Sequence, residues 1–230
     1  MYKYELHAHT SEVSTCAYAP ASKLVEAYVR LGYSGVVITD HFNNYILESY
    51  KGRGRDRVER YLEGYYKAKE YARKYDFTVL LGAETCLLPG PEDFLIYGID
   101  EEFLYKHSKM YTMSQEALYN VCKKYKADIN GKKTPIVFLQ AHPCRSYCKP
   151  RDHRFLDGVE VYNANPRHSN NNDKALEFAS INADYILTSG SDYHEFGDEG
   201  LGGIETDIKI ADNADLIKVL QSGNYKLIKN

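Results

Sequence analysis

The sequence predicts an α/β fold, either a barrel of parallel strands covered by helices or a close relative of that barrel. Short runs of apolar, β-branched residues alternate with helical patterns along almost the whole chain, as expected for parallel strands joined by helices. The chain has 230 residues and is 43% hydrophobic, which is enough to bury a substantial core. No Pro/Gly/Ser-rich linker, low-complexity tract or fixed-period repeat interrupts the series, so we expect one domain over residues 1–230.

The first half of the chain alternates strand and helix patterns from its beginning. The expected strands are 2–8, 35–39 and 78–82, and the expected helices are 21–31 and 55–75. Pro20 and Ser22 favour the start of the first helix, and Gly32 favours its end. The second strand is a continuous apolar run, which is typical of a strand buried on both faces.

The second half continues this alternation. The expected strands are 94–97, 135–139, 158–162, 185–188, 204–208 and 225–228. The expected helices are 114–126, 173–181 and a short one that begins near Asp212. Ser114 is a residue type that caps helix N-termini, so it sets the start of the first of these helices.

Charge and cysteine content exclude several classes of protein. The net charge is −3 and no long Lys/Arg block occurs, so nucleic acid is not an expected partner. The first residues lack the pattern of a signal peptide and no apolar run approaches bilayer length, so we expect a cytoplasmic protein that does not bind membranes. Five cysteines without CxxC spacing suit neither a disulfide framework nor a zinc knuckle.

Metal-binding side chains follow several of the expected strands. They occur in His7-Ala8-His9-Thr10, Thr39-Asp40-His41, Gly82-Ala83-Glu84, Gln140-Ala141-His142-Pro143 and Ser191-Asp192-Tyr193-His194. A single histidine of this kind is most often an ordinary core or surface residue. Five segments that each place such a side chain after a strand indicate a shared metal site instead. In a barrel the C-terminal ends of the strands share one face, so these side chains should converge there. The sequence therefore predicts a site for several metal ions.

The spacing of these residues indicates their roles. His7 and His9 stand at i and i+2 on one strand, so both rings project to the same side and can chelate one ion. A carboxylate can bridge two cations whereas imidazole cannot, so Glu84 is the expected bridging ligand. We expect His41 to be a ligand that Asp40 orients. Mixed imidazole and carboxylate ligands favour Zn²⁺, Mn²⁺ or Fe²⁺ over Mg²⁺ or Ca²⁺.

These five motifs resemble those of the PHP family, named for polymerase and histidinol phosphatase, and the resemblance covers essentially the whole chain. It implies a distorted seven-stranded (β/α) barrel, TIM-like in plan, with two or three divalent metal ions at the strand C-termini. Most members of that family hydrolyse phosphoesters. The resemblance also implies a ligand set for each ion: His7, His9, Glu84 and Asp192 for the first, Glu84 and His142 for the second, His41 and His194 for the third.

Two positions depart from the fullest family pattern. Where relatives often have a His or Asp ligand after the first motif, this chain offers Glu12 and Cys16, and we expect Glu12 to bind because a carboxylate suits a hydrolytic ion. Where some relatives have a His after the fourth strand, this chain has Asp100. Asp100 is equally suited to bind the second ion and to cap the helix that follows it.

The resemblance and the ligands together predict a phosphoesterase that uses a metal-activated water on a small phosphorylated substrate. Arg145 follows the His142 motif and is a candidate catalytic residue that clamps a phosphate oxygen, with an ordinary surface arginine as the alternative. Histidinol phosphate or another small phosphomonoester is the expected substrate. A protein-tyrosine phosphatase, a nuclease of the same family, and a catalytically silent metal-containing binding or regulatory module stay open as alternatives.

Overall fold

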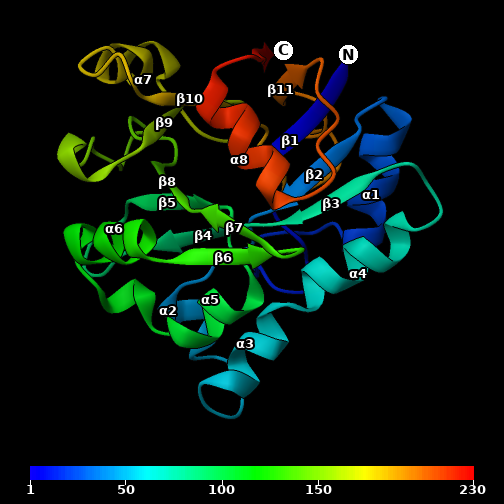
Figure 1. Ribbon diagram of the computed structural model, residues 1–230, viewed down its shortest axis with the longest axis horizontal. Coiled ribbons are helices and arrows are strands. Elements are labelled where there is room, and N and C mark those ends of the chain that lie inside the picture. Colours follow the sequence, from blue (N-terminus) through cyan, green and yellow to red (C-terminus); the bar gives the residue numbers. More distant parts are fainter.

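A computed structural model describes residues 1–230, and it shows two five-stranded sheets surrounded by helices (Figure 1). The strands are β1 (Tyr2–Ala8), β2 (Gly35–Ile38), β3 (Thr78–Leu81), β4 (Ala83–Cys86), β5 (Asp93–Tyr97), β6 (Lys126–Ile129), β7 (Lys132–Pro135), β8 (Val137–Gln140), β9 (Gly158–Asn163), β10 (Ile186–Gly190), β11 (Gly202–Thr206) and β12 (Lys226–Lys229). The helices are α1 (Ala21–Arg30), α2 (Asn44–Leu47), α3 (Arg55–Tyr61), α4 (Glu63–Ala72), α5 (Glu101–Lys106), α6 (Gln115–Lys124), α7 (Asn172–Ala179) and α8 (Asn213–Ser222).

The sheets are mixed rather than purely parallel. The first has the strand order β12-β11-β1-β2-β3, and the second has the order β10-β9-β8-β5-β4. Strands β1, β2 and β3 pair in parallel, as do β8, β9 and β10, whereas β5 is antiparallel to both of its neighbours and β11 is antiparallel to β1. The α/β class is confirmed. A single closed barrel of seven strands is not confirmed, because the strands form two sheets.

The two sheets are joined at several places, and two of them lie beside the predicted ligands. At one of them the chain passes from β3 directly into β4 through Gly82. At the other, the Tyr193 amide donates to the carbonyl of His7 at 3.1 Å and the His9 amide donates to the carbonyl of Tyr193 at 2.9 Å. The C-terminal end of β1 is therefore held against the chain that follows β10, and segments far apart in sequence meet there.

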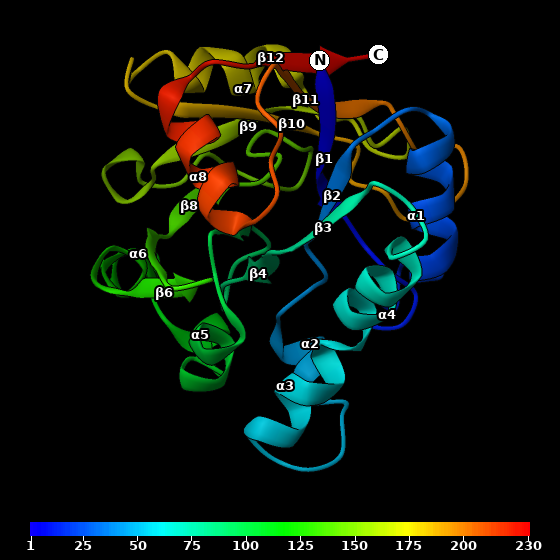
Figure 2. The ribbon, with the colours of Figure 1, turned by 45° about the vertical axis from the view of Figure 1, so that its right-hand side comes forward.

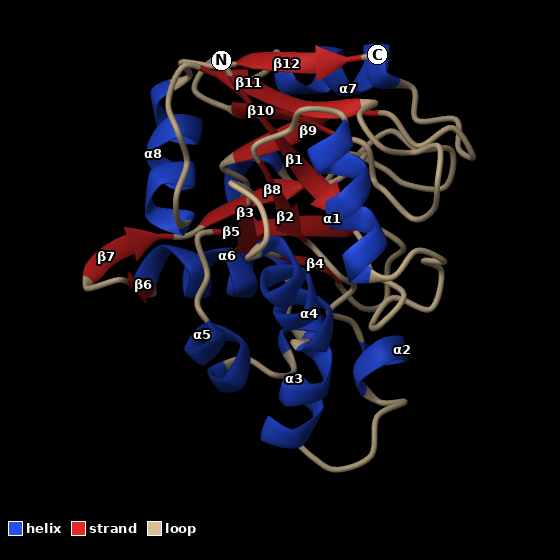
Figure 3. Ribbon diagram, turned by 90° about the vertical axis from the view of Figure 1, so that its right-hand side faces the viewer, coloured by secondary structure: helices blue, strands red, loops and turns tan.

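Helices cover the outside of the sheets and leave loops at one end. Helices α1 and α4 pack against each other beside β2 and β3, while α8 lies across the molecule from them (Figure 3). Strands β1 and β12 both pair with β11 at the same edge of the molecule (Figures 1 and 2), but the two chain ends lie at opposite ends of β11 (Figure 3), with Tyr2 beside Thr206 and Lys229 beside Gly202. Apolar side chains from both sheets, among them Leu6, Leu95 and Leu139, form one buried cluster between the sheets. No helix combines the length and the apolar character that crossing a bilayer requires.

Several local features differ from the expectations. The helix expected over 55–75 is divided into α3 and α4, and residues 126–135 form the hairpin β6–β7 where only the end of a helix was expected. The turn of that hairpin is Asn130-Gly131, with φ of 52° and 77°, the backbone conformation that Asn-Gly adopts readily in two-residue hairpins. A further difference is the reversed direction of β5, and it decides which acidic residue reaches the site.

Candidate metal centre

The structure brings seven of the predicted ligands into one cluster, with Asp93 as an eighth member that the sequence analysis did not identify. Candidate ligand atoms lie within 4.8 Å of one another in four overlapping groups: His9, His41 and His194; His7, His142 and Asp192; His7, His9 and Glu84; and Glu84, Asp93 and His142. Each of these residues lies at or next to the end of a strand, where the two sheets meet. The expected convergence of strand ends is therefore what places these side chains together.

Glu84 lies at the centre of the cluster, and its two carboxylate oxygens face different histidines. Oε1 is 3.1 Å from His7 Nε2 and 3.1 Å from His142 Nε2. Oε2 is 2.8 Å from His41 Nδ1 and 3.4 Å from His9 Nε2. A carboxylate whose two oxygens address separate imidazole groups has the arrangement that bridging two cations requires.

Several buried atoms of the cluster have no hydrogen-bond partner, although carboxylates lie close to them. These atoms are His7 Nε2, His9 Nε2, His41 Nδ1 and Glu84 Oε2. A buried polar atom without a partner costs free energy, about 1–3 kcal/mol for a typical group. Cations placed among these atoms would satisfy all of them at once, so the residues fit a divalent-metal centre.

One carboxylate oxygen of Asp192 faces the cluster, and the other contacts an arginine. Its Oδ1 is 3.2 Å from His9 Nε2, and its Oδ2 accepts a hydrogen bond from Arg145 Nη2 at 2.5 Å. Arg145 is buried and also donates to the side chains of Asn163 and Asn170, each at 3.0 Å. The structure thus places Arg145 against a predicted ligand, in a buried position and not on the surface.

Glu160, inside β9, contacts two of the histidines at atoms that face away from Glu84. Its Oε1 lies 2.9 Å from His7 Nδ1, and its Oε2 accepts hydrogen bonds from the His142 amide at 3.0 Å and from Asn163 Nδ2 at 2.9 Å. Because Nδ1 of His7 faces Glu160, Nε2 is directed at Glu84. Metal-binding histidines commonly contact a carboxylate with the ring nitrogen that does not bind the metal. Gly190 permits the approach, since a Cβ there would lie 2.4 Å from His7 Cβ and 2.7 Å from Glu160 Oε1.

Glu5 holds together the two strands that lead to His7 and Asp192. The pairing of β1 with β2 changes register between Glu5 and Ala8, and the Glu5 carboxylate accepts the amides of Leu6 and His7, each at 2.9 Å. The same carboxylate accepts the Ser191 amide at 3.0 Å, directly before Asp192. Burial opposes its ionisation, and the pKa of Glu5 is raised despite these hydrogen bonds.

A charged residue inside an apolar strand was the signal that could have identified both Glu5 and Glu160. Glu160 interrupts Gly158-Val159-Glu160-Val161-Tyr162, and Glu5 precedes Leu6 in the first strand. A buried carboxylate is unfavourable unless it is paired or hydrogen-bonded, so each of them implies nearby donors.

Asp40 anchors the loop that follows β1 instead of orienting the His41 ring. Its carboxylate accepts hydrogen bonds from the Thr10 amide, the Thr10 hydroxyl and the Ser14 hydroxyl, each at 2.7 Å. The Ser14 hydroxyl oxygen in turn accepts the His41 amide at 3.1 Å and lies 3.3 Å from His9 Nδ1. Asp40 therefore acts on His9 and His41 through Ser14.

Two of the ligand residues have left-handed backbone conformations. His142 has a φ of 27° and Asp192 a φ of 51°, values that residues with a side chain rarely adopt. The hydrogen bonds from the His142 amide to Glu160 and from Arg145 to Asp192 hold these positions in place. Backbone strain of this kind is concentrated at functional sites in proteins.

The electrostatic surroundings differ across the cluster. Burial opposes the protonation of His7, but the carboxylates around it outweigh this effect and raise the pKa of His7 well above its ordinary value. Burial and the neighbouring imidazoles lower the pKa of His9 well below its ordinary value. Burial and the nearby charge of Glu84 raise the pKa of Asp93 to about 6. His9 is therefore held in the neutral form, which is the form that binds metal ions.

Asp93, not Asp100, reaches the cluster, because β5 runs antiparallel to its neighbours. The C-terminal end of β5 points away from the cluster, and Asp100 caps α5 there by accepting the Phe103 amide at 2.8 Å. Asp100 also lines a separate hollow of about 670 Å³ that contains none of the clustered residues. Asp93 begins the same strand and faces Glu84 and His142. We therefore replace Asp100 by Asp93 among the candidate ligands.

Glu12 is likewise outside the cluster, and Cys16 is beside it. The Glu12 carboxylate accepts the Ala21 amide at 2.9 Å at the start of α1, so it caps a helix. Cys16 is exposed and lies in the loop beside His194, whose carbonyl accepts the Tyr18 amide at 2.8 Å and the Ala19 amide at 3.3 Å. Partial burial raises the pKa of the Cys16 thiol, but His194 and His41 outweigh that effect and lower the pKa to about 6. The structure thus places Glu12 at the start of α1 and leaves Cys16 as the residue of this loop beside the histidines.

Comparison with known proteins gives the family of this chain. The family model described as the PHP domain matches residues 5–195, so the chain belongs to the PHP domain family. A comparison with curated proteins finds no match.

Solved structures with a similar fold have low sequence identity to this chain. A two-domain protein from Bacteroides vulgatus, described as containing a predicted PHP-like metal-dependent phosphoesterase, aligns with a TM-score of 0.70 at 14% identity; the alignment covers 100% of this chain and 65% of that one. PsfC from Pseudomonas syringae aligns with a TM-score of 0.70 at 14% identity, covering 100% and 93%. An amidohydrolase from Chromobacterium violaceum, with bound sulfate and no metal, aligns with a TM-score of 0.55 at 12% identity, covering 97% of each chain. These likenesses concern the fold.

Proposed function

We propose that this protein is a metal-dependent phosphoesterase that hydrolyses a small phosphomonoester at a centre of two or three divalent ions. The observation that carries the proposal is the position of Glu84, whose two oxygens face separate pairs of histidines within 3.4 Å. Membership of the PHP domain family supports the reaction class. Zn²⁺, Mn²⁺ and Fe²⁺ are the ions that this mixture of imidazole and carboxylate suits.

The clustered residues divide into three proposed ligand sets. The first ion would be held by His7, His9, Glu84 and Asp192, the second by Glu84, Asp93 and His142, and the third by His41 and His194 with His9 nearby. When bound, the ions would lower the pKa of water to supply the nucleophile and would neutralise charge on the phosphate oxygens. Glu160, Glu5 and Ser14 keep the ligand side chains aimed at one another before substrate arrives.

Arg145 has one N–H group left for the substrate. Of its five donors, one goes to Asn170, two at Nη2 go to Asn163 and Asp192, and one at Nη1 goes to the Tyr147 hydroxyl at 3.3 Å. The remaining Nη1 hydrogen is available to a phosphate oxygen beside Tyr147, whose side chain is half exposed. Arg145 thus holds Asp192 in place and presents a single donor to the phosphate.

The experiment that tests the proposal is hydrolysis of a generic aryl phosphate by protein stripped of metal and then loaded with Mn²⁺ or Zn²⁺. Turnover should require the metal, and Glu84→Gln should lower kcat/KM by more than about 100-fold, because even the loss of a supporting contact typically costs about 10–100-fold. Glu102→Gln, on the exposed side of α5, is the matched control and should keep full activity.

A substrate panel separates the alternatives. Faster turnover of small phosphomonoesters, histidinol phosphate among them, than of a phosphotyrosine peptide or an oligonucleotide is the expected outcome. Stoichiometric metal binding without turnover of any member would instead identify a silent binding module, and the proposed reaction would be rejected.

A further inference from the structure

One tyrosine hydroxyl lies at the boundary between the buried cluster and solvent. The Tyr147 hydroxyl accepts a hydrogen bond from Arg145 Nη1 at 3.3 Å, and Nη2 of the same arginine donates to Asp192 Oδ2. A guanidinium group is planar and rigid, so it holds the hydroxyl and the carboxylate in a fixed relation. Arg145 and Asp192 are buried, whereas Tyr147 is 50% exposed. The hydroxyl is therefore one arginine away from a candidate ligand and still within reach of solvent.

Contacts from two loops hold Tyr147 in this place. The centroid of its ring is 5.9 Å from that of His168, and the two rings meet edge-on at 81°. His168 lies in the loop after β9, and that loop is tied to Arg145 because Asn170 Oδ1 accepts a hydrogen bond from Arg145 Nε at 3.0 Å. The hydroxyl is thus positioned beside Arg145 before a substrate binds.

The Tyr147 hydroxyl has a hydrogen left to donate. A tyrosine hydroxyl is both a donor and an acceptor, and its contact with Arg145 uses it as the acceptor. Burial raises the pKa of Tyr147 above its ordinary value, although Arg145 opposes this effect. The hydroxyl therefore keeps its proton at neutral pH.

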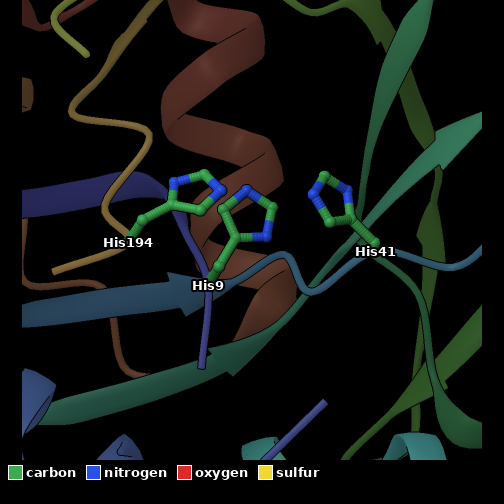
Figure 4. A group of neighbouring side chains, drawn as sticks. All are labelled: His9, His41 and His194. Atoms are coloured by element: carbon green, nitrogen blue, oxygen red, sulfur yellow. The ribbon is translucent and has the colours of Figure 1, made fainter. Parts of the chain in front are cut away.

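The histidines of the cluster face inward instead. His9, His41 and His194 have ligand atoms within 4.8 Å of one another, and their rings turn toward a common region (Figure 4). In the proposed centre these nitrogens bind a cation, which requires the unprotonated form of each ligand atom. They cannot donate a proton to the substrate from the same atoms.

The burial of the cluster decides which part of a substrate meets Tyr147. Glu84 and Asp192 are each 1% exposed, so a phosphate that reaches them turns its organic group toward solvent. The ester oxygen, which joins the phosphate to that group, then lies on the outward side. Tyr147 is the side chain that combines contact with Arg145 and access from that side.

We propose that the Tyr147 hydroxyl is the general acid that protonates the leaving oxygen of the phosphomonoester. The inference rests on the proposed function and adds a catalytic residue to it. A water oxygen bonds to phosphorus, the ester P–O bond breaks with its electron pair going to the leaving oxygen, and that oxygen takes the Tyr147 proton. The proton lost by the attacking water passes to solvent, and a solvent proton restores Tyr147. Arg145 stabilises the transient phenolate through a charge-assisted hydrogen bond.

Leaving groups of different basicity test this role. 4-Nitrophenolate is a weaker base than a tyrosine phenolate and leaves without a proton, whereas the alkoxide of 2-phenylethyl phosphate requires one. Tyr147→Phe should lower kcat/KM by at least about 100-fold for 2-phenylethyl phosphate and by less than about threefold for 4-nitrophenyl phosphate, since general acid catalysis contributes about 10²–10⁴-fold. The metal content of the variant should stay unchanged in elemental analysis, because the Tyr147 hydroxyl bonds to Arg145 and not to a candidate ligand.

Two variants and one measurement on the natural protein complete the test. Tyr75→Phe is the matched control, because Tyr75 is also exposed but precedes β3 at the end away from the cluster, and it should leave both rates unchanged. His168→Gln should keep the ratio of the two rates, because the contact of His168 is with the Tyr147 ring. The solvent deuterium isotope effect on kcat of the natural protein should be larger for 2-phenylethyl phosphate than for 4-nitrophenyl phosphate.

The outcomes separate this inference from the proposed function. An equal loss for both substrates in Tyr147→Phe would make Tyr147 a phosphate-binding residue, and a loss for 2-phenylethyl phosphate in His168→Gln alone would assign the proton to His168. Either result, or no loss in Tyr147→Phe, would overturn the inference and leave the proposed phosphoesterase intact. Natural protein that hydrolyses neither substrate after loading with Mn²⁺ or Zn²⁺ would reject the proposed function and this inference together.

Discussion

Glu160→Gln is the most informative substitution among the residues that hold the candidate ligands in place. Glutamine has the same shape as glutamate, but its side chain cannot accept hydrogen bonds at both terminal atoms. Glu160 accepts the His142 amide and Asn163 Nδ2 with one oxygen, while the other lies against His7 Nδ1. If the amide NH₂ of the glutamine faces His142 and Asn163, two buried donors lose their acceptor. If it faces His7, Nδ1 must become the acceptor and the proton moves to Nε2, the atom directed at Glu84.

Both orientations carry a definite cost. Two unsatisfied buried donors cost about 1–3 kcal/mol each, so the metal-free protein should lose about 2 kcal/mol or more in its free energy of unfolding. A protonated Nε2 on His7 removes a ligand atom from the first proposed ion. Loss of such supporting contacts typically lowers metal affinity by about 10–100-fold, which corresponds to about 1.4–2.8 kcal/mol.

The assay is competition for Zn²⁺ or Mn²⁺ between the protein and a chromophoric chelator, with chemical denaturation of the metal-free protein in parallel. Glu177→Gln, on the exposed face of α7, is the control for a simple change of charge. Glu160→Gln with a metal affinity within about twofold of the natural protein would refute the reasoning, since every orientation of the glutamine should disturb a ligand.

Three further predictions concern separate parts of the structure. Asp93→Asn should weaken binding of one ion by at least about 10-fold in metal titration, whereas Asp100→Asn should leave metal content unchanged; the reverse result would restore Asp100 as a ligand. Gly64→Ala should destabilise the protein by about 1–3 kcal/mol in urea denaturation, because the new Cβ would lie 2.2 Å from Thr10 Oγ1. Alanine has the better helix propensity, so a stabilised variant would contradict this packing. Asp212→Ala should lower the free energy of unfolding by about 1 kcal/mol at neutral pH, because Asp212 caps α8. Burial opposes the ionisation of Asp212, but its hydrogen bonds outweigh that effect and lower its pKa, so the stabilisation is present above the ordinary pKa and is lost as the pH falls through the pKa of the folded state. An equal cost at about pH 7 and about pH 3 would be inconsistent with the lowered pKa.

Most of the secondary structure could be predicted from local patterns, but strand direction could not. The strand 94–97 was expected close to the bounds of β5, because its apolar run is a property of the sequence alone. Whether that strand runs parallel or antiparallel depends on its partners β4 and β8, which lie on either side of it in the sheet. That direction exchanges the two ends of the strand, and for this reason Asp93 rather than Asp100 reaches Glu84.

The sequence by itself determined the residues whose roles follow from position on a strand. His7 and His9 share a face because alternate residues of a strand do, and a glutamate after an apolar run predicted the central place of Glu84. These inferences need only the neighbouring residues and the knowledge that strand ends meet. The family came from the resemblance of five short motifs to a known family, and the match of the PHP domain model over residues 5–195 shows it.

Only the tertiary structure decided the roles that depend on contacts between distant segments. Arg145 acts on Asp192, which is 47 residues away in sequence, and Glu160 supports His7 across 153 residues. Whether Glu12 or Cys16 comes near the cluster depends on how the loop after β1 is tied to Asp40 and to the chain around His194. Such contacts are set by the packing of the two sheets, because sequence patterns fix which face a side chain lies on but not which partner it meets there.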